Sequence, residues 1–248
     1  MLTHAPDVLT LAIDTCDARG SVCLMDELGA AKTVVHDTGE DYSVWLLRAV
    51  EQVLSACRRS FSEVALYAAT AGPGSFTGIR VALTTVKAWN EVFGVPIAAV
   101  SRLEALARQA SRVSAGPDLV VACVDAGRGQ LYAGMFRREA EALTRIGDEA
   151  VFAAGELIEA AVAQAGELGI SWVALDPAAL TGAAEWESRA QRSESVQQVS
   201  GILAPAVAKL ARVMATENRL TDALHLDANY IRRPDAEVKW KGYAKPVV

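Results

Sequence analysis

Short apolar runs separated by brief polar turns open the chain. Residues 8–14, 20–26 and 31–37 form three such runs. Connections this short favour an antiparallel meander of strands. Residues 43–57 then change period, with apolar side chains three or four positions apart on one stripe. This spacing predicts a helix that follows the meander.

Strands and helices alternate through the rest of the first half. The pattern predicts a strand at 64–70, a helix at 78–93, a strand at 95–100 and a further helix from Ser101. Ser101 and Glu104 have the spacing of a capping box at the start of that last helix. The first 113 residues therefore predict three strands, a helix, and then strand, helix, strand and helix.

A looser copy of this order begins after the turn at 114–118. Apolar runs suited to strands lie at 119–126, 129–136, 141–146 and 171–175, and helical patterns at 155–165 and 203–217. The polar stretch 187–198 is typical of a surface loop. Because Asp14 and Asp125 each stand at the end of the first strand of their half, we expect a duplicated α/β unit. The predicted lobes are 1–113 and 114–248.

Composition narrows the class of protein. The chain has 248 residues, 52% of them hydrophobic, and a formal net charge of -6, which suits two modest lobes and disfavours binding of nucleic acid by the chain alone. Four cysteines without a C-x-x-C pair indicate buried thiols in a reducing cytoplasm. No signal peptide, no apolar run near the ~20 residues of a membrane span and no metal-ligand spacing is found. We predict a cytoplasmic protein without membrane association or cofactor.

A glycine-rich loop joins the strand at 64–70 to the helix at 78–93. Its residues of interest are Gly72, Gly74, Ser75, Thr77 and Gly78. The loop lacks the lysine of a P-loop, and Thr77 stands where the dinucleotide fingerprint requires glycine. Two interpretations stay open. Backbone N–H groups at the helix start could receive an anion, or the glycines allow close packing while Ser75 or Thr77 caps the helix.

Four segments of the chain resemble one known family. They are LAIDTCDARGSVCLM, AGPGSFTGIRVALTTVKAW, VDAGRGQLYAGMF and NYIRRPDAE. Together they are similar to the TsaB (YeaZ-like) proteins of bacteria, which take part in threonylcarbamoyladenosine synthesis on tRNA. The resemblance is strong over 8–136, patchy over 140–225, and returns at 229–237. It implies an actin/Hsp70/sugar-kinase-like (ASKHA) α/β fold of two ribonuclease-H-like lobes.

The resemblance also implies a role without catalysis. TsaB-like chains pair with the catalytic paralogue TsaD, and the ATPase TsaE joins the complex. The paralogue holds its metal with an H-x-x-x-H pair, and the matching positions here are Arg102 and Leu106. Neither side chain can bind a metal. Asp14, Thr15 and Asp125 are then vestigial phosphate-facing positions, although Asp14 could simply order the turn after its strand.

The family architecture places the partner interface on the helices at 43–57 and 78–93. The implied contact residues are Leu46, Leu47, Val50, Ile79, Arg80, Val86, Trp89 and Phe93. The helix at 78–93 is apolar around much of its circumference, which fits either core burial or a partner. An apolar face of this kind also predicts a homodimer when the partner is absent.

The C-terminal segment mixes cations and aromatic rings. It contains Tyr230, Arg232, Arg233, Lys239, Trp240, Lys241, Tyr243 and Lys245. This composition could contact tRNA within the assembled complex, or the segment could be a solvated tail. We expect tRNA to be bound only through the complex.

Two enzymatic alternatives remain. An independent ATPase or phosphotransferase of the same fold would need a general base, a magnesium site and an adenosine pocket, and Asp176-Pro177 replaces a glycine turn there. A metallopeptidase would need a zinc motif such as H-E-x-x-H, which the sequence does not contain.

Overall fold

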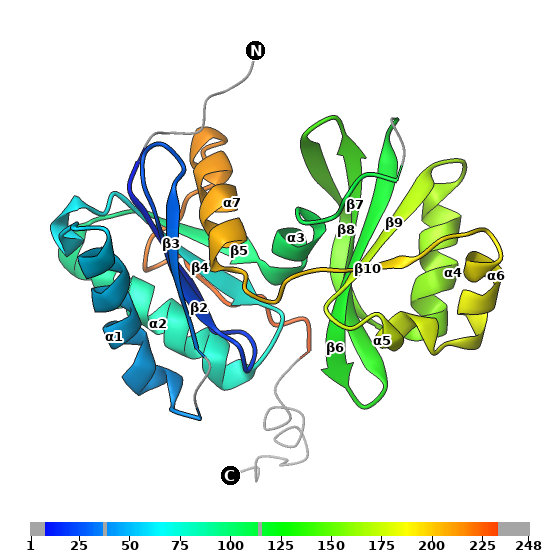
Figure 1. Ribbon diagram of the computed structural model, residues 1–248, viewed down its shortest axis with the longest axis horizontal. Coiled ribbons are helices and arrows are strands. Elements are labelled where there is room, and N and C mark those ends of the chain that lie inside the picture. The colour runs from blue at the N-terminus through cyan, green and yellow to red at the C-terminus, as the bar shows by residue number, and fades with distance from the viewer. Residues whose placement is uncertain (1–7, 37–38, 114–115, 233–248) are drawn as a thin grey trace, which may run out of the picture.

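Two five-stranded sheets lie side by side in the computed structural model, which describes residues 8–36, 39–113 and 116–232 (Figure 1). The first sheet has the order β3-β2-β1-β4-β5 and the second the order β10-β9-β6-β7-β8. The strands of the first sheet are β1 (Thr10–Asp14), β2 (Ser21–Met25), β3 (Ala31–Val35), β4 (Leu66–Gly72) and β5 (Ile97–Ser101). Those of the second are β6 (Asp118–Gly127), β7 (Gln130–Glu139), β8 (Ala142–Ala153), β9 (Gly169–Ala174) and β10 (Val196–Gln198).

The two sheets share one connectivity. In the first, β1, β2 and β3 pair antiparallel, while β4 joins β1 and β5 joins β4 in parallel. In the second, β6, β7 and β8 pair antiparallel, while β9 joins β6 and β10 joins β9 in parallel. The duplicated unit predicted from the sequence is therefore confirmed.

Helices cover both faces of each sheet (Figure 1). α1 (Tyr42–Ala56) and α2 (Phe76–Phe93) cover the outer face of the first sheet, and α4 (Ala154–Ala165) that of the second. Between the sheets lie α3 (Arg102–Ala107) and α7 (Ala204–Thr216). The shorter elements are the 3-10 turns η1 (Phe61–Glu63) and η2 (Ala184–Trp186) and the helices α5 (Ala178–Thr181) and α6 (Glu187–Ala190).

Apolar side chains gather into three clusters that follow these layers. One lies between the first sheet and α1 and α2, and another between the second sheet and α4. The third lies between the lobes, where α3 and α7 contribute side chains such as Leu106 and Val207 and both sheets supply the rest. Because this central cluster draws on both halves of the chain, the lobes share a core.

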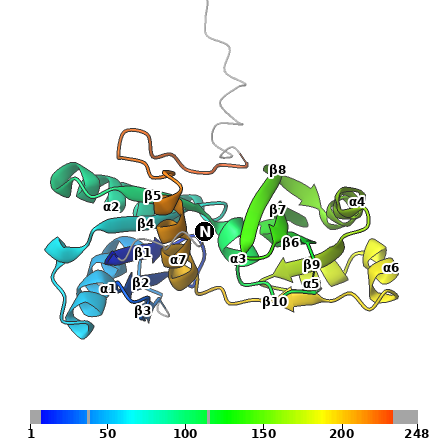
Figure 2. The same cartoon turned by 90° about the horizontal axis from the view of Figure 1, so that it is seen from above.

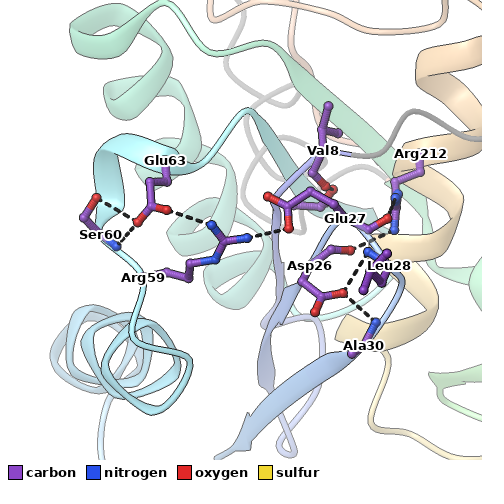
Figure 3. Close-up of polar contacts among 10 residues, drawn as sticks. Val8, Asp26, Glu27, Leu28, Ala30, Arg59, Ser60, Glu63 and Arg212 are labelled. Atoms are coloured by element: carbon purple, nitrogen blue, oxygen red, sulfur yellow. Dashed lines mark hydrogen bonds and ion pairs between the residues drawn. The ribbon is translucent and has the colours of Figure 1, made fainter.

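Helix α7 corrects the division predicted from the sequence. A boundary at 113/114 separates the two sheets but assigns α7 to the second lobe, whereas α7 packs on β1, β2, β4 and β5 of the first. Its buried Arg212 donates to the carbonyl oxygens of Asp26 (3.1 Å) and Glu27 (3.0 Å) in the β2–β3 turn (Figure 3). A single boundary along the sequence cannot show this packing, because a helix can pack against strands that are distant in sequence.

Two predicted elements differ in extent. β8 is longer than the predicted strand at 141–146 and carries a register shift in its pairing with β7. The polar stretch 187–198, expected as a loop, contains α6 and the edge strand β10. β10 pairs with β9 through its backbone (Val196 opposite Trp172), so its polar side chains gave no strand signal.

Candidate functional site: the cleft between the lobes and the outer helices

A cleft of about 1140 Å³ lies between the two lobes. Residues from the turn after β1, the glycine loop, the start of α3, the β6–β7 turn and the segment after β9 line it. The sequence-predicted residues Gly74, Ser75, Arg102 and Asp125 are among them, and so is Asp176. The fold therefore brings together positions from both halves of the chain.

Asp14 and Asp125 each accept a hydrogen bond from the backbone N–H two residues further along the chain. The fully buried Asp14 accepts a hydrogen bond on Oδ1 from the backbone N–H of Cys16, at 3.1 Å. The exposed Asp125 accepts one from the N–H of Gly127, at 2.8 Å. Burial raises the pKa of Asp14, and the nearby Arg102 opposes that rise. The Asp14 carboxylate thus orders the turn after β1, as the structural interpretation of Asp14 expects, whereas Asp125 and Gly127 lie within β6 at a shift in its register with β7.

The glycine loop packs tightly against the turn after β1. The N–H of Ser75 donates to the carbonyl of Cys16 at 2.8 Å, and the Thr15 hydroxyl donates to the carbonyl of Gly78 at 2.6 Å. A Cβ on Gly78 would stand 1.8 Å from the Thr15 oxygen, and one on Gly74 2.4 Å from the Cys16 oxygen. Both glycines are therefore required by the close approach of two backbones.

Ser75 caps the helix that follows the loop. Its hydroxyl accepts a hydrogen bond from the N–H of Gly78 at 3.3 Å, at the N-terminus of α2. Thr77 is exposed within the first turn of the helix. Gly72 has a φ of 118°, in the region that favours glycine. These contacts support the packing interpretation of the loop over the anion-binding one.

The resemblance implies that Arg102 and Leu106 stand at the positions of the paralogue's metal ligands. The Arg102 side chain is buried, forms an ion pair with Asp17 and donates to the Pro73 carbonyl at 3.4 Å. Leu106 is completely buried in the central cluster. In the part of the chain that the structure describes, no group of three or more His, Cys, Asp or Glu residues is placed to hold a metal ion. The Arg102–Asp17 pair, which joins residues far apart in sequence, had no local sequence signal.

Half of the predicted contact residues lie inside the first lobe, which corrects the sequence interpretation. Leu46, Val50, Ile79 and Val86 are buried between the helices and the sheet. Their helical stripes are the core faces of α1 and α2, so they offer no surface to a partner. A buried stripe and a docking stripe have the same sequence periodicity, which is why the pattern could not separate them.

The other four contact residues reach the surface to different degrees. Leu47 and Phe93 are each 53% exposed, and Arg80 is exposed. Trp89 is only partly exposed, because its ring packs against Phe61 at 5.0 Å and Tyr67 at 5.4 Å between centroids.

Two exposed residues of these helices were missed. Val44 of α1 is 55% exposed and Val92 of α2 is 72% exposed. Both lie off the buried stripes of their helices. Each is followed directly by another apolar residue, Trp45 or Phe93, so the sequence alone did not show that these valines face solvent. We name Val44, Leu47, Val92 and Phe93 the outer apolar set.

A C-terminal strap, residues 217–232, crosses from the first lobe to the second (Figure 2). Thr221 pairs with Ile97 of β5, and the N–H of Asn229 donates to the Ala71 carbonyl at 2.8 Å. The Asn229 side chain donates to Glu149 of β8 at 2.5 Å, and Ser101 donates to the same carboxylate. Burial raises the pKa of Glu149. The tail cations and rings beyond Arg232 lie outside the described residues.

Within the described ranges, no helix is long and apolar enough to cross a membrane.

The duplicated sheets with meander and parallel strands, joined across a cleft, define a two-lobed α/β protein. The structure of YeaZ from Pseudomonas aeruginosa shares this fold, with a TM-score of 0.67 at 24% identity over 90% of this chain and 99% of that one. Residues 34–240 match the family model described as TsaD: tRNA N6-adenosine threonylcarbamoyltransferase. The chain belongs to this family.

Relatives along nearly the whole chain carry a single description. The tRNA threonylcarbamoyladenosine biosynthesis protein TsaB of Bacillus subtilis is 25% identical over 93% of this chain and 96% of its own length. The TsaB protein of Escherichia coli is 25% identical over the same shares, and that of Haemophilus influenzae is 27% identical over 93% and 95%. The similarity to TsaB and YeaZ proteins expected from the sequence is confirmed.

Proposed function

We propose that this chain is a non-catalytic subunit that docks onto a TsaD-type threonylcarbamoyltransferase and activates it in tRNA threonylcarbamoyladenosine synthesis. The names of its full-length relatives and its family place it beside that reaction. The observation that carries the proposal is that Arg102 is paired with Asp17 and that Leu106 is buried, at the two positions where the resemblance implies metal ligands in the paralogue. Neither side chain can offer a lone pair to a metal.

The outer apolar set provides the proposed docking surface. Its four side chains project from α1 and α2, the helices on the outside of the first lobe (Figure 1). Val44 and Leu47 lie in the first half of α1, and Val92 and Phe93 lie at the end of α2, where the Phe93 ring contacts Phe61 beyond the end of α1. The set therefore offers two apolar sites, and exposed apolar side chains are a feature of protein interfaces. In the cell this surface would bind the transferase, with a TsaE-type ATPase joining the complex and tRNA bound through it. Without the partner, the same surface would pair two copies of the chain.

An independent ATPase or phosphotransferase is the second candidate function, favoured only by the size of the cleft between the lobes. Against it, the N–H groups of Ser75 and Gly78 are already engaged by Cys16 and Ser75. Calorimetry with ATP and magnesium separates the candidates. Tight stoichiometric binding of ATP would support the enzymatic candidate, and we expect no such binding.

Reconstitution tests the main proposal directly. The catalytic partner, threonylcarbamoyl adenylate, the ATPase and tRNA are supplied, and this chain is titrated in. We expect threonylcarbamoyl transfer to rise and to saturate near an equimolar ratio with the partner. Transfer that does not depend on this chain would overturn the proposed function.

A further inference from the structure

A small pocket lies where the glycine loop, the β6–β7 turn and the C-terminal strap meet. Its volume is about 170 Å³. A cavity of roughly 150 Å³ can hold benzene, so this pocket admits an aromatic ring. Its lining residues include Phe76, Arg128, Tyr132, Tyr230 and Arg232, and no Asp or Glu. The pocket lies beside the large cleft and has a different lining apart from Gly74 and Tyr132.

Aromatic rings and a guanidinium group form a stack at the pocket. The rings of Phe76 and Tyr230 lie 5.2 Å apart with an angle of 32° between their planes. The guanidinium carbon of Arg80 lies 3.7 Å from the centroid of the Phe76 ring, and its Nε donates to the Tyr230 hydroxyl at 3.2 Å. Tyr230 is nevertheless 37% exposed. A held but partly exposed ring offers stacking area at low entropic cost.

Positive charge accompanies these rings. Arg232 donates to the carbonyl of Ala126 at 2.8 Å and to Oε1 of Gln130 at 2.6 Å, and both acceptors are neutral. Among residues 8–36, 39–113 and 116–232, no ion pair joins Arg80 or Arg232 to a carboxylate. The pocket therefore combines an aromatic surface with the guanidinium of Arg232, which no described carboxylate pairs.

We propose that this pocket binds one nucleotide of a single-stranded RNA loop, with the base against Tyr230 and a backbone phosphate near Arg232. Unstacked bases of RNA loops are recognised by aromatic rings and arginine planes, and the phosphates by cations. Because the whole chain is acidic, with a net charge of -6, the contact is local and sensitive to salt.

The inference rests on the proposed function only for the source of the RNA, a tRNA anticodon loop. Binding itself is measured on the isolated full chain and again on its complex with the transferase, by fluorescence anisotropy of a labelled anticodon-stem-loop RNA at low salt. Tyr230→Ala removes the ring, whereas Tyr230→Phe keeps it and loses only the hydroxyl. We expect Tyr230→Ala to weaken RNA binding about 5- to 100-fold, as loss of one stacking ring does, and Tyr230→Phe to bind nearly as wild type.

Arg232→Gln tests the phosphate contact independently. We expect weaker binding and a reduction of about 0.7 in the log–log salt slope, the amount for one phosphate of a single strand. Wild-type melting temperatures in all three variants exclude a folding defect. If one variant loses stability, crosslinking of a photoreactive RNA to Tyr230 in the wild-type chain shows whether this ring contacts the RNA.

Two results would overturn the inference. The first is failure of the wild-type chain to bind the RNA both alone and in the complex, and the second is equal affinity of Tyr230→Ala and wild type. Loss of transferase docking in Tyr230→Ala with unchanged RNA affinity would show that the pocket receives the partner protein instead. A chain that binds RNA through the pocket but does not stimulate transfer would contradict the proposed function alone.

Discussion

In the glycine loop, contacts with nearby backbone groups decide which residue type each position accepts. Ser75 or Thr77 was expected to cap the helix, and the structure shows that Ser75 does so. The capping box at Ser101 is only half formed. Its hydroxyl accepts from the N–H groups of Leu103 and Glu104, while the Glu104 carboxylate lies 3.8 Å from Arg108. Arg108, four residues after Glu104, could be read from the sequence, but the sequence did not show that Glu104 would lie beside it.

Gly78→Ala tests the packing role of the loop. The added Cβ would overlap the Thr15 carbonyl, so the loop or the turn after β1 must shift. We expect the free energy of unfolding to fall by about 1–3 kcal/mol, as for other overpacked sites, measured by urea denaturation. Gly39→Ala is the matched control, because its Cβ would meet no atom within 4 Å. Equal stability of the two variants would contradict the role assigned to Gly78.

Glu149 predicts a pH dependence of stability. Its pKa is raised in the folded chain by burial from a usual value of 4.5. As pH rises above 4.5, the Glu149 carboxyl therefore stays protonated to a higher pH in the folded state than in the unfolded state. The free energy of unfolding then decreases as pH rises towards the folded-state pKa. We expect Glu149→Gln to flatten this decrease in urea unfolding measured at a series of pH values.

The exposed Glu51 of α1 supplies the control for that series. Glu51→Gln should leave the slope of wild type unchanged, because its carboxylate lies in solvent. If Glu149→Gln also keeps the wild-type slope, another group is responsible for the pH dependence.

At the scale of elements, α1 and α2 have two kinds of apolar residue. Periodicity located both helices to within two residues, but it could not tell a core stripe from the docking stripe that the resemblance implied. A substitution at Trp89 would disturb the aromatic cluster with Phe61 and Tyr67, so it cannot separate docking from folding. Substitutions in the outer apolar set can separate docking from folding, because solvent already surrounds much of each side chain.

Leu47→Glu is the sharpest test of that surface. Leu47 is half exposed, so the variant should fold normally and lose affinity for the transferase at least tenfold, as charge burial in an apolar interface requires. Calorimetric titration with the partner measures the loss. Leu28→Glu, at a leucine 94% exposed in the β2–β3 turn, should bind as wild type. Unchanged affinity of Leu47→Glu would remove α1 from the interface.

At the scale of the whole molecule, the chain returns twice to its first lobe. Helix α7 packs on the first sheet, and the C-terminal strap then joins β5, β4 and β8. These long-range contacts and the shared central cluster tie the lobes together. We therefore expect the chain to unfold as one cooperative unit in which α7 stabilises the first lobe.

Arg212→Met tests the attachment of α7. The variant keeps an unbranched apolar stem but removes the guanidinium, which leaves the carbonyls of Asp26 and Glu27 without these donors (Figure 3). We expect a loss of about 1–3 kcal/mol in the free energy of unfolding, measured by urea denaturation. Arg219→Met, at an arginine about half exposed beside Glu217, should change stability by no more than about 0.5 kcal/mol. Equal effects would mean that the Arg212 contacts contribute little.

The sequence by itself determined the duplicated order of elements and the family resemblance. Each of these depends on residue identity or on periodicity over a few turns. Only the tertiary structure decided that Leu46, Val50, Ile79 and Val86 are core, that α7 belongs to the first lobe, and that Arg102 pairs with Asp17. It also brought Tyr230 to Phe76 and Asn229 to Glu149. Such contacts join residues distant in sequence, and a local pattern carries no information about which distant segment will cover it.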